Sequence, residues 1–434
     1  MTESEPRRDE AAGVSGTQPT TERPGAPSPG AADPDPAAAP AGTASEVFLV
    51  FLRLGLTSFG GPVAHLAFFR EALVRRRRWL DEAAYAELIA LCQFLPGPAS
   101  SQAGLALGLL RAGLPGALAA WAAFTLPSAI ALAVFAAGVG AMDAAGAGWL
   151  VGVKAAAVAV VAQAALGMGR SLAPDRPRQA LAAAAAALAL LAPGVAGQLG
   201  AIALGAVFGL LSASTVAEAA AAPTGAPLRP PLSRSAGAGC LAAAALLLAG
   251  LPLLASLGPL AAHADAFYRA GALVFGGGHV VLPLLEAETV GRGWVDAETF
   301  VAGYGAAQAV PGPLFAFAAF LGQASAGIPG AVVSLVAIFL PGALLVIGAL
   351  PFWAALRARP RARAALAGVN AAVVGLLLAA LYDPVFARGA AEPAGFVIAM
   401  AAWLALTGWK LSPPLAVLGA AVLGQGLGWA GLLG

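Results

Sequence analysis

The sequence predicts an all-α polytopic membrane protein with two inverted-topology repeats, broken or re-entrant helices and about 10–13 membrane segments. Two observations support this fold class. The 434 residues are 59% hydrophobic and only 11% charged, with a mean hydropathy of +0.82, whereas soluble proteins carry about 25% charged residues. Apolar stretches also follow one another along the chain, and many approach the roughly 20 residues that a spanning helix needs. A soluble globular domain is excluded, because this composition cannot cover a water-facing surface.

The N-terminal residues 1–45 differ from the rest of the chain. They are rich in Pro, Ala, Gly, Ser and acidic residues and have no apolar periodicity, so we expect a disordered tail. The Pro-rich, polar residues 214–236 predict a linker between two halves. The predicted membrane segments are 46–69, 84–110, 114–140, 147–169, 178–192, 195–213, 237–257, 266–287, 300–322, 328–351, 364–382, 394–409 and 412–432.

The two halves of the chain repeat each other in order and spacing. The matching motifs are FLRLGLTSFGG (51–61) with FYRAGALVFGG (267–277), CQFLPGP (92–98) with AQAVPGP (307–313), and GLPGALAAWAAFTLP (113–127) with GIPGAVVSLVAIFLP (327–341). Ordered matches of Pro, Gly and Gln do not arise by chance between Ala-rich helices. We therefore predict a first repeat over 46–213, an inverting transmembrane helix over 237–257 and a second repeat over 266–434, an organisation common among transporters.

Arginine placement predicts the topology, because positive charge in short loops stays cytoplasmic. The arginine clusters share one side if 46–69 and 84–110 each enter and return on the same face, and likewise 266–287 and 300–322. All four stretches carry a central Gly or Pro interruption, which is tolerated at membrane depth inside protein. The helix 237–257 then starts the second repeat on the opposite face. A topology in which every segment crosses the membrane once also inverts the second half relative to the first. The sequence therefore leaves two topologies open, one with re-entrant hairpins and one with full spans.

The interrupted segments predict an anion site. A helix broken inside the membrane leaves free N–H groups and a positive dipole end, which bind anions. Interruptions at equivalent positions of two repeats indicate a transporter site; the alternative is that Gly and Pro are simply frequent in membrane helices. We expect the four breaks to meet near the midplane and to form a substrate site from Gly60, Gly61, Pro96, Gly97, Pro98, Gly276, Gly277, Pro311, Gly312 and Pro313.

Polar side chains near the breaks extend the predicted substrate-binding set. Arg53 and Arg269 stand at equivalent positions before Phe-Gly-Gly, where each either binds the anion or extends to the membrane interface. Gln93 and Gln308 precede Pro-Gly-Pro and either donate to an oxyanion or cap the broken helix. Lys154 lies inside its span and either faces the solute or forms a structural ion pair.

Proton coupling requires a group that titrates within the membrane. The candidates are His65, Glu87, His279 and Glu286, and histidine is the side chain poised near neutral pH; an interfacial position is the alternative for Glu286. The sequence predicts neither a metal site nor a cofactor, because its three His are dispersed and its two Cys lie in apolar surroundings. The chain has no Walker-type phosphate loop and no zinc-protease motif, so ATP drive and an enzyme are both excluded.

Together these motifs resemble the chromate ion transporter family in its long, two-domain form. The residues that carry the resemblance are FLRLGLTSFGGPVAHL (51–66), RRWLDEAAYAELIALCQFLPGPASSQ (77–102), GLPGALAAWAAFTLPS (113–128), FGGGHVVLPLLEAE (275–288), GWVDAETFVAGYGAAQAVPGP (293–313) and GVNAAVVGLL (368–377). The resemblance covers the chain from residue 46 onward, apart from the linker. It implies export of chromate across the cytoplasmic membrane, driven by the proton-motive force, with chromate resistance as the result.

The residues alone do not separate chromate from sulfate, since both are tetrahedral oxyanions. Uptake or exchange of sulfate or a similar oxyanion is therefore the alternative function. Gly278-His279 in the second half replaces Pro62-Val63 in the first, so we expect the halves to differ in role. The expected partners are the oxyanion and the lipid bilayer of the cytoplasmic membrane, with no nucleic acid. A homodimer stays open.

Overall fold

The computed structural model of the protein describes residues 42–59, 61–141, 148–192, 194–212, 232–275, 278–357 and 359–433. Every regular element within these ranges is a helix. Among them, the helical segments long and apolar enough to cross a membrane are Ala99–Gly138, Gly148–Leu172, Arg234–Leu257, Leu314–Leu356 and Pro360–Gly389. The protein is thus an all-α polytopic membrane protein, as its composition predicts. The predicted tail and linker lie mostly outside the described residues.

Each predicted membrane segment coincides with one helix or with two helices separated by a break. The first half contains α1 (Ala44–Thr57), α2 (Gly61–Phe69), η2 (Arg70–Arg76), α3 (Glu82–Phe94), α4 (Ala99–Ala141), α5 (Gly148–Leu172), α6 (Arg176–Leu191) and α7 (Val195–Leu211). Next come α9 (Arg234–Leu254) and η3 (Ala255–Leu257). The second half contains α10 (Pro259–Ala272), η4 (Gly278–Val280), α11 (Val281–Thr289), α12 (Ala297–Ala309), η5 (Leu314–Ala316), α13 (Phe317–Ala349), η6 (Leu350–Phe352), α14 (Trp353–Arg357), α15 (Pro360–Ala380), η7 (Leu381–Phe386), α16 (Ala387–Gly389), α17 (Pro393–Thr407) and α18 (Pro413–Trp429).

The interruptions predicted at the Gly and Pro motifs are present. Helices α1 and α10 end just before the Phe-Gly-Gly motifs, and α3 and α12 end just before the Pro-Gly-Pro motifs. The helix that precedes each Pro-Gly-Pro starts at an equivalent aspartate. Asp81 caps α3 by accepting from Ala84 N at 2.6 Å, and Asp296 caps α12 by accepting from Thr299 N at 2.8 Å. The repeated Trp-x-Asp motif is therefore a helix start in both halves.

Helices α4 and α13 each contain a sharp reversal at an equivalent glycine. Gly113 has φ 65° and ψ −160°, and Gly327 has φ 65° and ψ −159°. Because the chain folds back there, Gly108 meets the Gly116 backbone, eight residues along. Each long helix is therefore a hairpin of two arms. The internal sequence repeat is thus accompanied by the same backbone conformation in both halves.

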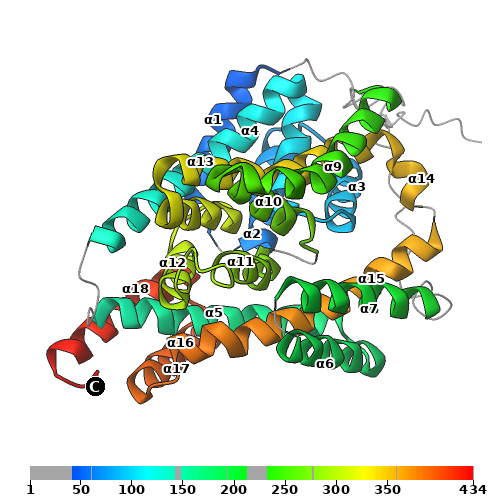
Figure 1. The fold of residues 1–434 in the computed structure, drawn as a ribbon. Helices are drawn as coiled ribbons and strands as arrows, with labels where there is room; N and C mark the ends of the chain where they lie inside the picture. The colour runs from blue at the N-terminus through cyan, green and yellow to red at the C-terminus, as the bar shows by residue number, and fades with distance from the viewer. Residues whose placement is uncertain are drawn as a thin grey trace, which may run out of the picture. The chain divides into compact units, whose positions relative to one another are not determined.

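The helices pack in two groups with the short central helices between them (Figure 1). One group joins α4 to α1 and α13, and α13 to α9 and α10. The other joins α5 to α15, α17 and α18, and α15 to α6 and α7. Helices α11 and α12 contact both groups, since α11 touches α10 and α15 while α12 touches α13 and α5. The central helices, which flank the breaks, are therefore held from both sides.

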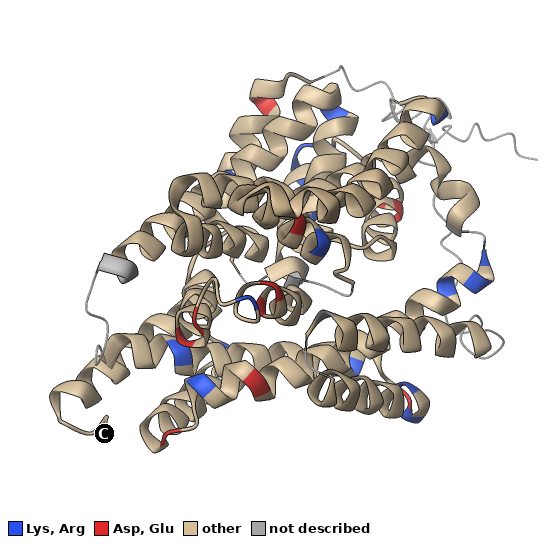
Figure 2. Ribbon diagram, in the orientation of Figure 1, with Lys and Arg blue, Asp and Glu red and all other residues tan. Residues whose placement is uncertain are grey.

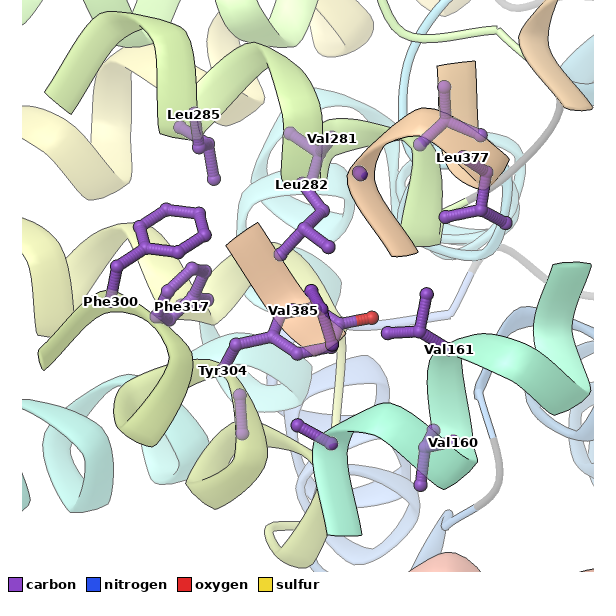
Figure 3. Packing of buried hydrophobic residues seen from close by; sticks show 14 of the residues in the cluster. Val160, Val161, Val281, Leu282, Leu285, Phe300, Tyr304, Phe317, Leu377 and Val385 are labelled. Atoms are coloured by element: carbon purple, nitrogen blue, oxygen red, sulfur yellow. The ribbon is translucent and has the colours of Figure 1, made fainter. Parts of the chain in front are cut away.

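The buried core contains side chains from both halves. Figure 3 shows side chains of α5 packed with those of α11, α12, α13, α15 and η7, namely Val160, Val161, Val281, Leu282, Leu285, Phe300, Tyr304, Phe317, Leu377 and Val385. A second cluster joins α1–α4 to Val346, Leu350 and Trp353 of the second half. Since each cluster includes both halves, neither half buries its apolar surface alone.

The close approach inside the α4 hairpin gives a stability prediction. In Gly108→Ala the added methyl group meets the Gly116 backbone, and overpacking of this kind costs about 1–3 kcal/mol. We expect a lower midpoint of thermal unfolding for the detergent-solubilised protein. Gly138→Ala is the matched control on the same helix, because a Cβ there meets open space, and it should unfold at or slightly above the wild-type temperature. Equal midpoints for the two variants would contradict the hairpin.

Candidate functional site

The four helix breaks meet, and two backbone hydrogen bonds join them across the halves. The Gly97 N–H donates to the Val274 carbonyl at 2.7 Å, and the Gly312 N–H donates to the Ser58 carbonyl at 3.0 Å. Gly97 and Gly312 are the centres of the two Pro-Gly-Pro motifs, and Ser58 and Val274 are equivalent residues before Phe-Gly-Gly. Each Pro-Gly-Pro break is thus bonded to the other half. The place where these breaks meet is called the junction below. Because its two N–H groups are hydrogen-bonded within the protein, free donors at the junction must come from other groups.

The central glycines of both Pro-Gly-Pro breaks are required by conformation and by space. Gly97 has φ +123° and Gly312 has φ +104°, which glycine adopts without steric cost. A Cβ on Gly97 would lie 3.1 Å from Gly342 Cα in α13, and one on Gly312 would lie 2.8 Å from Ser128 Oγ in α4. Each break therefore sits against the second arm of the long hairpin in the opposite half.

A glutamine secures the first of these contacts. The Gln102 amide nitrogen donates to the Pro96 carbonyl at 2.8 Å and to the Gly342 carbonyl at 3.3 Å. Gln102 is fully buried, and its backbone N–H donates to the Pro98 carbonyl at 2.9 Å. Its side chain links the break before α4 to helix α13.

A small cavity of about 20 Å³ lies at the junction. Two helix N-termini border it, because Gly61 begins α2 and Leu314 begins η5, which continues into α13. The N–H groups and the dipole of a helix N-terminus favour negative charge. The lining residues come from both halves and are Gly61, His279, Ala307, Gln308, Val310, Gly312, Leu314 and Pro413.

Two polar side chains of the second half line this cavity. His279 Nδ1 is 2.7 Å from the Tyr304 hydroxyl, and its other ring nitrogen, Nε2, is the nearest atom to a Cβ placed on Gly61, at 3.9 Å. The Gln308 amide nitrogen is buried and has no hydrogen-bond partner among the described residues. Buried polar atoms without partners are rare in folded proteins, so this amide marks a place where a ligand oxygen can bind.

The first half contributes a second group of buried polar atoms beside its breaks. His65, in α2, has Nδ1 3.4 Å from Ser100 Oγ at the start of α4. His65 Nε2, Ser58 Oγ and Ser101 Oγ are buried, and the described residues offer them no hydrogen-bond partner. The structure therefore brings both predicted histidines, His65 and His279, to the breaks.

Two predicted ligands lie away from the junction. The Arg53 side chain is exposed on α1, and the Gln93 side chain is exposed in a surface groove that it shares with Arg70 and Glu82. Their repeat partners, Arg269 and Gln308, are more buried. The equivalence in sequence thus does not extend to the surroundings of these side chains.

Lys154 forms an ion pair at the far end of α12. Its Nζ is 3.2 Å from Glu298 Oε2, and Glu298 is in the first turn of α12. That helix has 13 residues, so at a rise of 1.5 Å per residue about 20 Å separate the pair from the break at Pro311. Of the two sequence-based alternatives for Lys154, the structure contains the ion pair.

The two glutamates predicted as proton-coupling candidates lie outside the lining of the cavity. The buried Glu87 accepts from the Trp353 indole N–H at 2.9 Å, which links α3 to α14. Glu286 is partly buried on α11 and does not line the cavity. The glycines predicted at 60, 276 and 277 lie outside the described residues.

Arg269 belongs to a network of four charged side chains in the second half. Its guanidinium is 3.0 Å from Asp265 Oδ2 and 2.9 Å from Glu288 Oε1. Arg292 is 2.7 Å from the other oxygen of Glu288. Figure 2 shows acidic and basic positions together at α10 and around α11, in a protein whose charges are few. Asp265 and Glu288 are almost fully buried, so the two arginines compensate two desolvated carboxylates.

Sequence reasoning missed several residues of the junction. Tyr304 lies on α12 in a stretch that reads as ordinary apolar helix, and Ser58 and Val274 contribute only carbonyl groups. Ser128 and Gly342 carried a signal, because each directly follows the proline of an equivalent Leu-Pro in its repeat. At that repeated position, each long hairpin contacts the Pro-Gly-Pro break of the other half.

Comparison with known proteins adds an independent line of evidence. The model of the chromate transporter family matches residues 45–210 and 261–425, one match in each half. The chain is 31% identical over 394 residues to the chromate transport protein of Cupriavidus metallidurans, covering 89% of this chain and 94% of that protein. It is 31% identical over 358 residues to the chromate transport protein of Pseudomonas aeruginosa (78% and 80% covered), and 29% over 420 residues to the probable chromate transport protein of Synechococcus elongatus (89% and 96%). No solved structure matches the chain.

The network around Arg269 gives a stability prediction. Glu288→Ala leaves Arg269 and Arg292 with only Asp265, and removing one partner of a buried ion pair costs about 3 kcal/mol or more. We expect a clearly lower thermal unfolding midpoint in detergent. Glu286→Ala, two residues away on the same helix and in no ion pair with the described residues, is the control and should stay near wild type. A Glu288→Ala midpoint equal to that of the control would show that the network contributes no stability.

Proposed function

The chain belongs to the chromate transporter family, and we propose that it exports chromate across the cytoplasmic membrane by secondary active transport. Coupling to the proton-motive force and chromate resistance are part of the proposal. The observation that carries it is the pair of crossed hydrogen bonds, Gly97 to Val274 and Gly312 to Ser58, which joins the helix breaks of the two halves beside one small cavity. Broken helices that meet between two repeats are the usual construction of a transporter substrate site.

The chemistry of the cavity suits a tetrahedral oxyanion. Its borders include the N-termini of α2 and η5, at Gly61 and Leu314, and helix N-termini bind phosphate-like anions through backbone N–H groups. The unpartnered Gln308 amide and the His279 ring add side-chain donors. No Lys or Arg side chain lines the cavity in the described residues, so the proposed ligands are N–H dipoles.

The size of the cavity suggests how transport proceeds. A volume of about 20 Å³ accommodates about one water molecule, which is less than a tetrahedral oxyanion needs. The junction must therefore open to admit substrate. We propose that the two halves, in inverted topology, move against each other about the crossed hydrogen bonds and expose the cavity to one side of the membrane at a time.

Proton coupling is assigned in this proposal to the histidines at the breaks. His65 and His279 lie beside the first break of their respective halves, and histidine changes charge near neutral pH. Glu87 is bonded to Trp353 and Glu286 is outside the cavity lining, so neither contacts the proposed substrate position. His279 lines the cavity, so a change in its charge would change the affinity of the site for the oxyanion.

Transport in inside-out membrane vesicles tests the proposed function. We expect vesicles that contain the protein to accumulate radiolabelled chromate when their interior is acidic, and a protonophore to abolish the accumulation. Vesicles from cells without the protein are the control. Faster flux of sulfate than of chromate would favour the alternative oxyanion transporter, and the absence of any oxyanion flux would overturn the proposal.

A glycine substitution tests the proposed site. Gly312→Ala puts a side chain at φ +104° and against Ser128, and such backbone strain costs about 1–3 kcal/mol. We expect chromate flux to fall at least tenfold while the amount of protein in the membrane is retained. Gly419→Ala on α18, where a Cβ meets open space, should transport like wild type. Unimpaired flux in Gly312→Ala would remove the Pro-Gly-Pro break from the substrate site.

A further inference from the structure

The polar lining of the cavity is not shared by the two repeats. In the second half, His279, Tyr304 and Gln308 come together at the break. The equivalent positions in the first half are Val63, Ile89 and Gln93, and the Gln93 side chain is exposed. A histidine and a tyrosine have thus been placed at one break of a duplicated structure, where the other copy has two aliphatic residues.

Tyr304 occupies a fixed position behind the histidine. Its side chain is fully buried, and its ring packs edge-on against Phe317 at a centroid distance of 5.8 Å. Figure 3 shows it within the core, among side chains of the neighbouring helices. The hydroxyl lies 2.7 Å from His279 Nδ1. This ring has little freedom to move, so its hydroxyl defines the orientation of the imidazole.

The direction of this hydrogen bond follows from the available partners. A buried O–H must donate to an acceptor, and His279 Nδ1 is the acceptor at hydrogen-bond distance. When Nδ1 accepts, the neutral imidazole carries its proton on Nε2. That nitrogen is the one toward Gly61 and the cavity.

We propose that Tyr304 is a positioning residue for oxyanion binding, because it selects the His279 tautomer whose Nε2–H donates into the cavity. His279 Nε2 and Gln308 Nε2 then form a pair of N–H donors, contributed by the second half alone, opposite the N-terminus of α2 in the first half. Tyr304 acts through His279 and does not itself line the cavity. This inference rests on the proposed oxyanion transport and names the group that orients its side-chain donor.

Substitution of the hydroxyl alone tests the inference. Tyr304→Phe keeps the ring and its contact with Phe317 but leaves Nδ1 without its donor, so both tautomers become accessible. We expect the KM for the transported oxyanion to rise about tenfold, the effect of one hydrogen bond to a charged group, with Vmax within about twofold of wild type. The matched control is Tyr85→Phe, which removes another tyrosine hydroxyl bonded inside the protein, to the Leu66 carbonyl, away from the cavity. Its KM should equal that of wild type.

A double-mutant cycle separates positioning from general packing. In the His279→Leu background no imidazole remains to be oriented, so Tyr304→Phe should change KM no further. Additive effects of the two substitutions, or equal KM values for Tyr304→Phe and wild type, would overturn the inference. Neither result would contradict oxyanion transport, which the wild-type flux measures separately. If wild type moves no oxyanion, the proposed function and the inference fall together.

A spectroscopic measurement keeps the inference testable if His279→Leu is inactive or unstable. The chain contains only three histidines, so ¹⁵N-histidine labelling of the reconstituted protein gives few signals, and His279→Leu or a second histidine variant assigns them. We expect His279 to be protonated on Nε2 in wild type and to show a mixture of tautomers in Tyr304→Phe. Protonation on Nδ1 in wild type, or an unchanged signal in Tyr304→Phe, would contradict the assigned role.

Discussion

Hydrogen bonding of the backbone inside the membrane is the constraint on which this structure depends. Water is absent from the bilayer core, so every N–H and carbonyl freed by a helix break needs a partner within the protein. The protein satisfies part of this demand with two bonds that cross between its halves, Gly97 to Val274 and Gly312 to Ser58. Neither half can make them alone, because each donor and its acceptor belong to different halves. The interlocked cores, in which helices of one half pack into the cluster of the other, agree with this mutual dependence.

The duplicated backbone carries different chemistry in its two copies. The turns at Gly113 and Gly327 have nearly the same dihedral angles, and Asp81 and Asp296 cap equivalent helices. The side chains at the breaks nevertheless differ. Gln102 bonds the first Pro-Gly-Pro break to α13, whereas in the second half a four-charge network around Arg269 links α10 to α11. Shared geometry supplies the junction, and unshared side chains give each half its own role there.

The Lys and Arg side chains predicted near the breaks do not line the cavity, which is left with neutral hydrogen-bond donors. The basic groups predicted near the breaks are either paired, as Lys154 with Glu298 and Arg269 with Asp265 and Glu288, or exposed, as Arg53. Desolvating an unpaired charge costs several kcal/mol, which explains why the buried arginine occurs with carboxylates. Helix N-termini and amide or imidazole N–H groups avoid that cost, because they offer partial positive charge without a full ion to desolvate.

The sequence by itself determined the fold class, the internal repeat and the motifs at which the helices break. These features depend on local properties: apolar length, the missing N–H of proline and the conformational freedom of glycine. It also predicted that the breaks would meet, since equivalent interruptions in two repeats face one interface.

Tertiary structure alone decided which side chains reach the junction. Arg53 and Arg269 occupy equivalent positions, yet one is exposed and the other is paired with two carboxylates. Tyr304, which no motif singled out, touches His279 because α12 packs beside η4 after the chain has folded. Contacts of this kind depend on helix packing between distant segments, and residue spacing along one chain does not encode them.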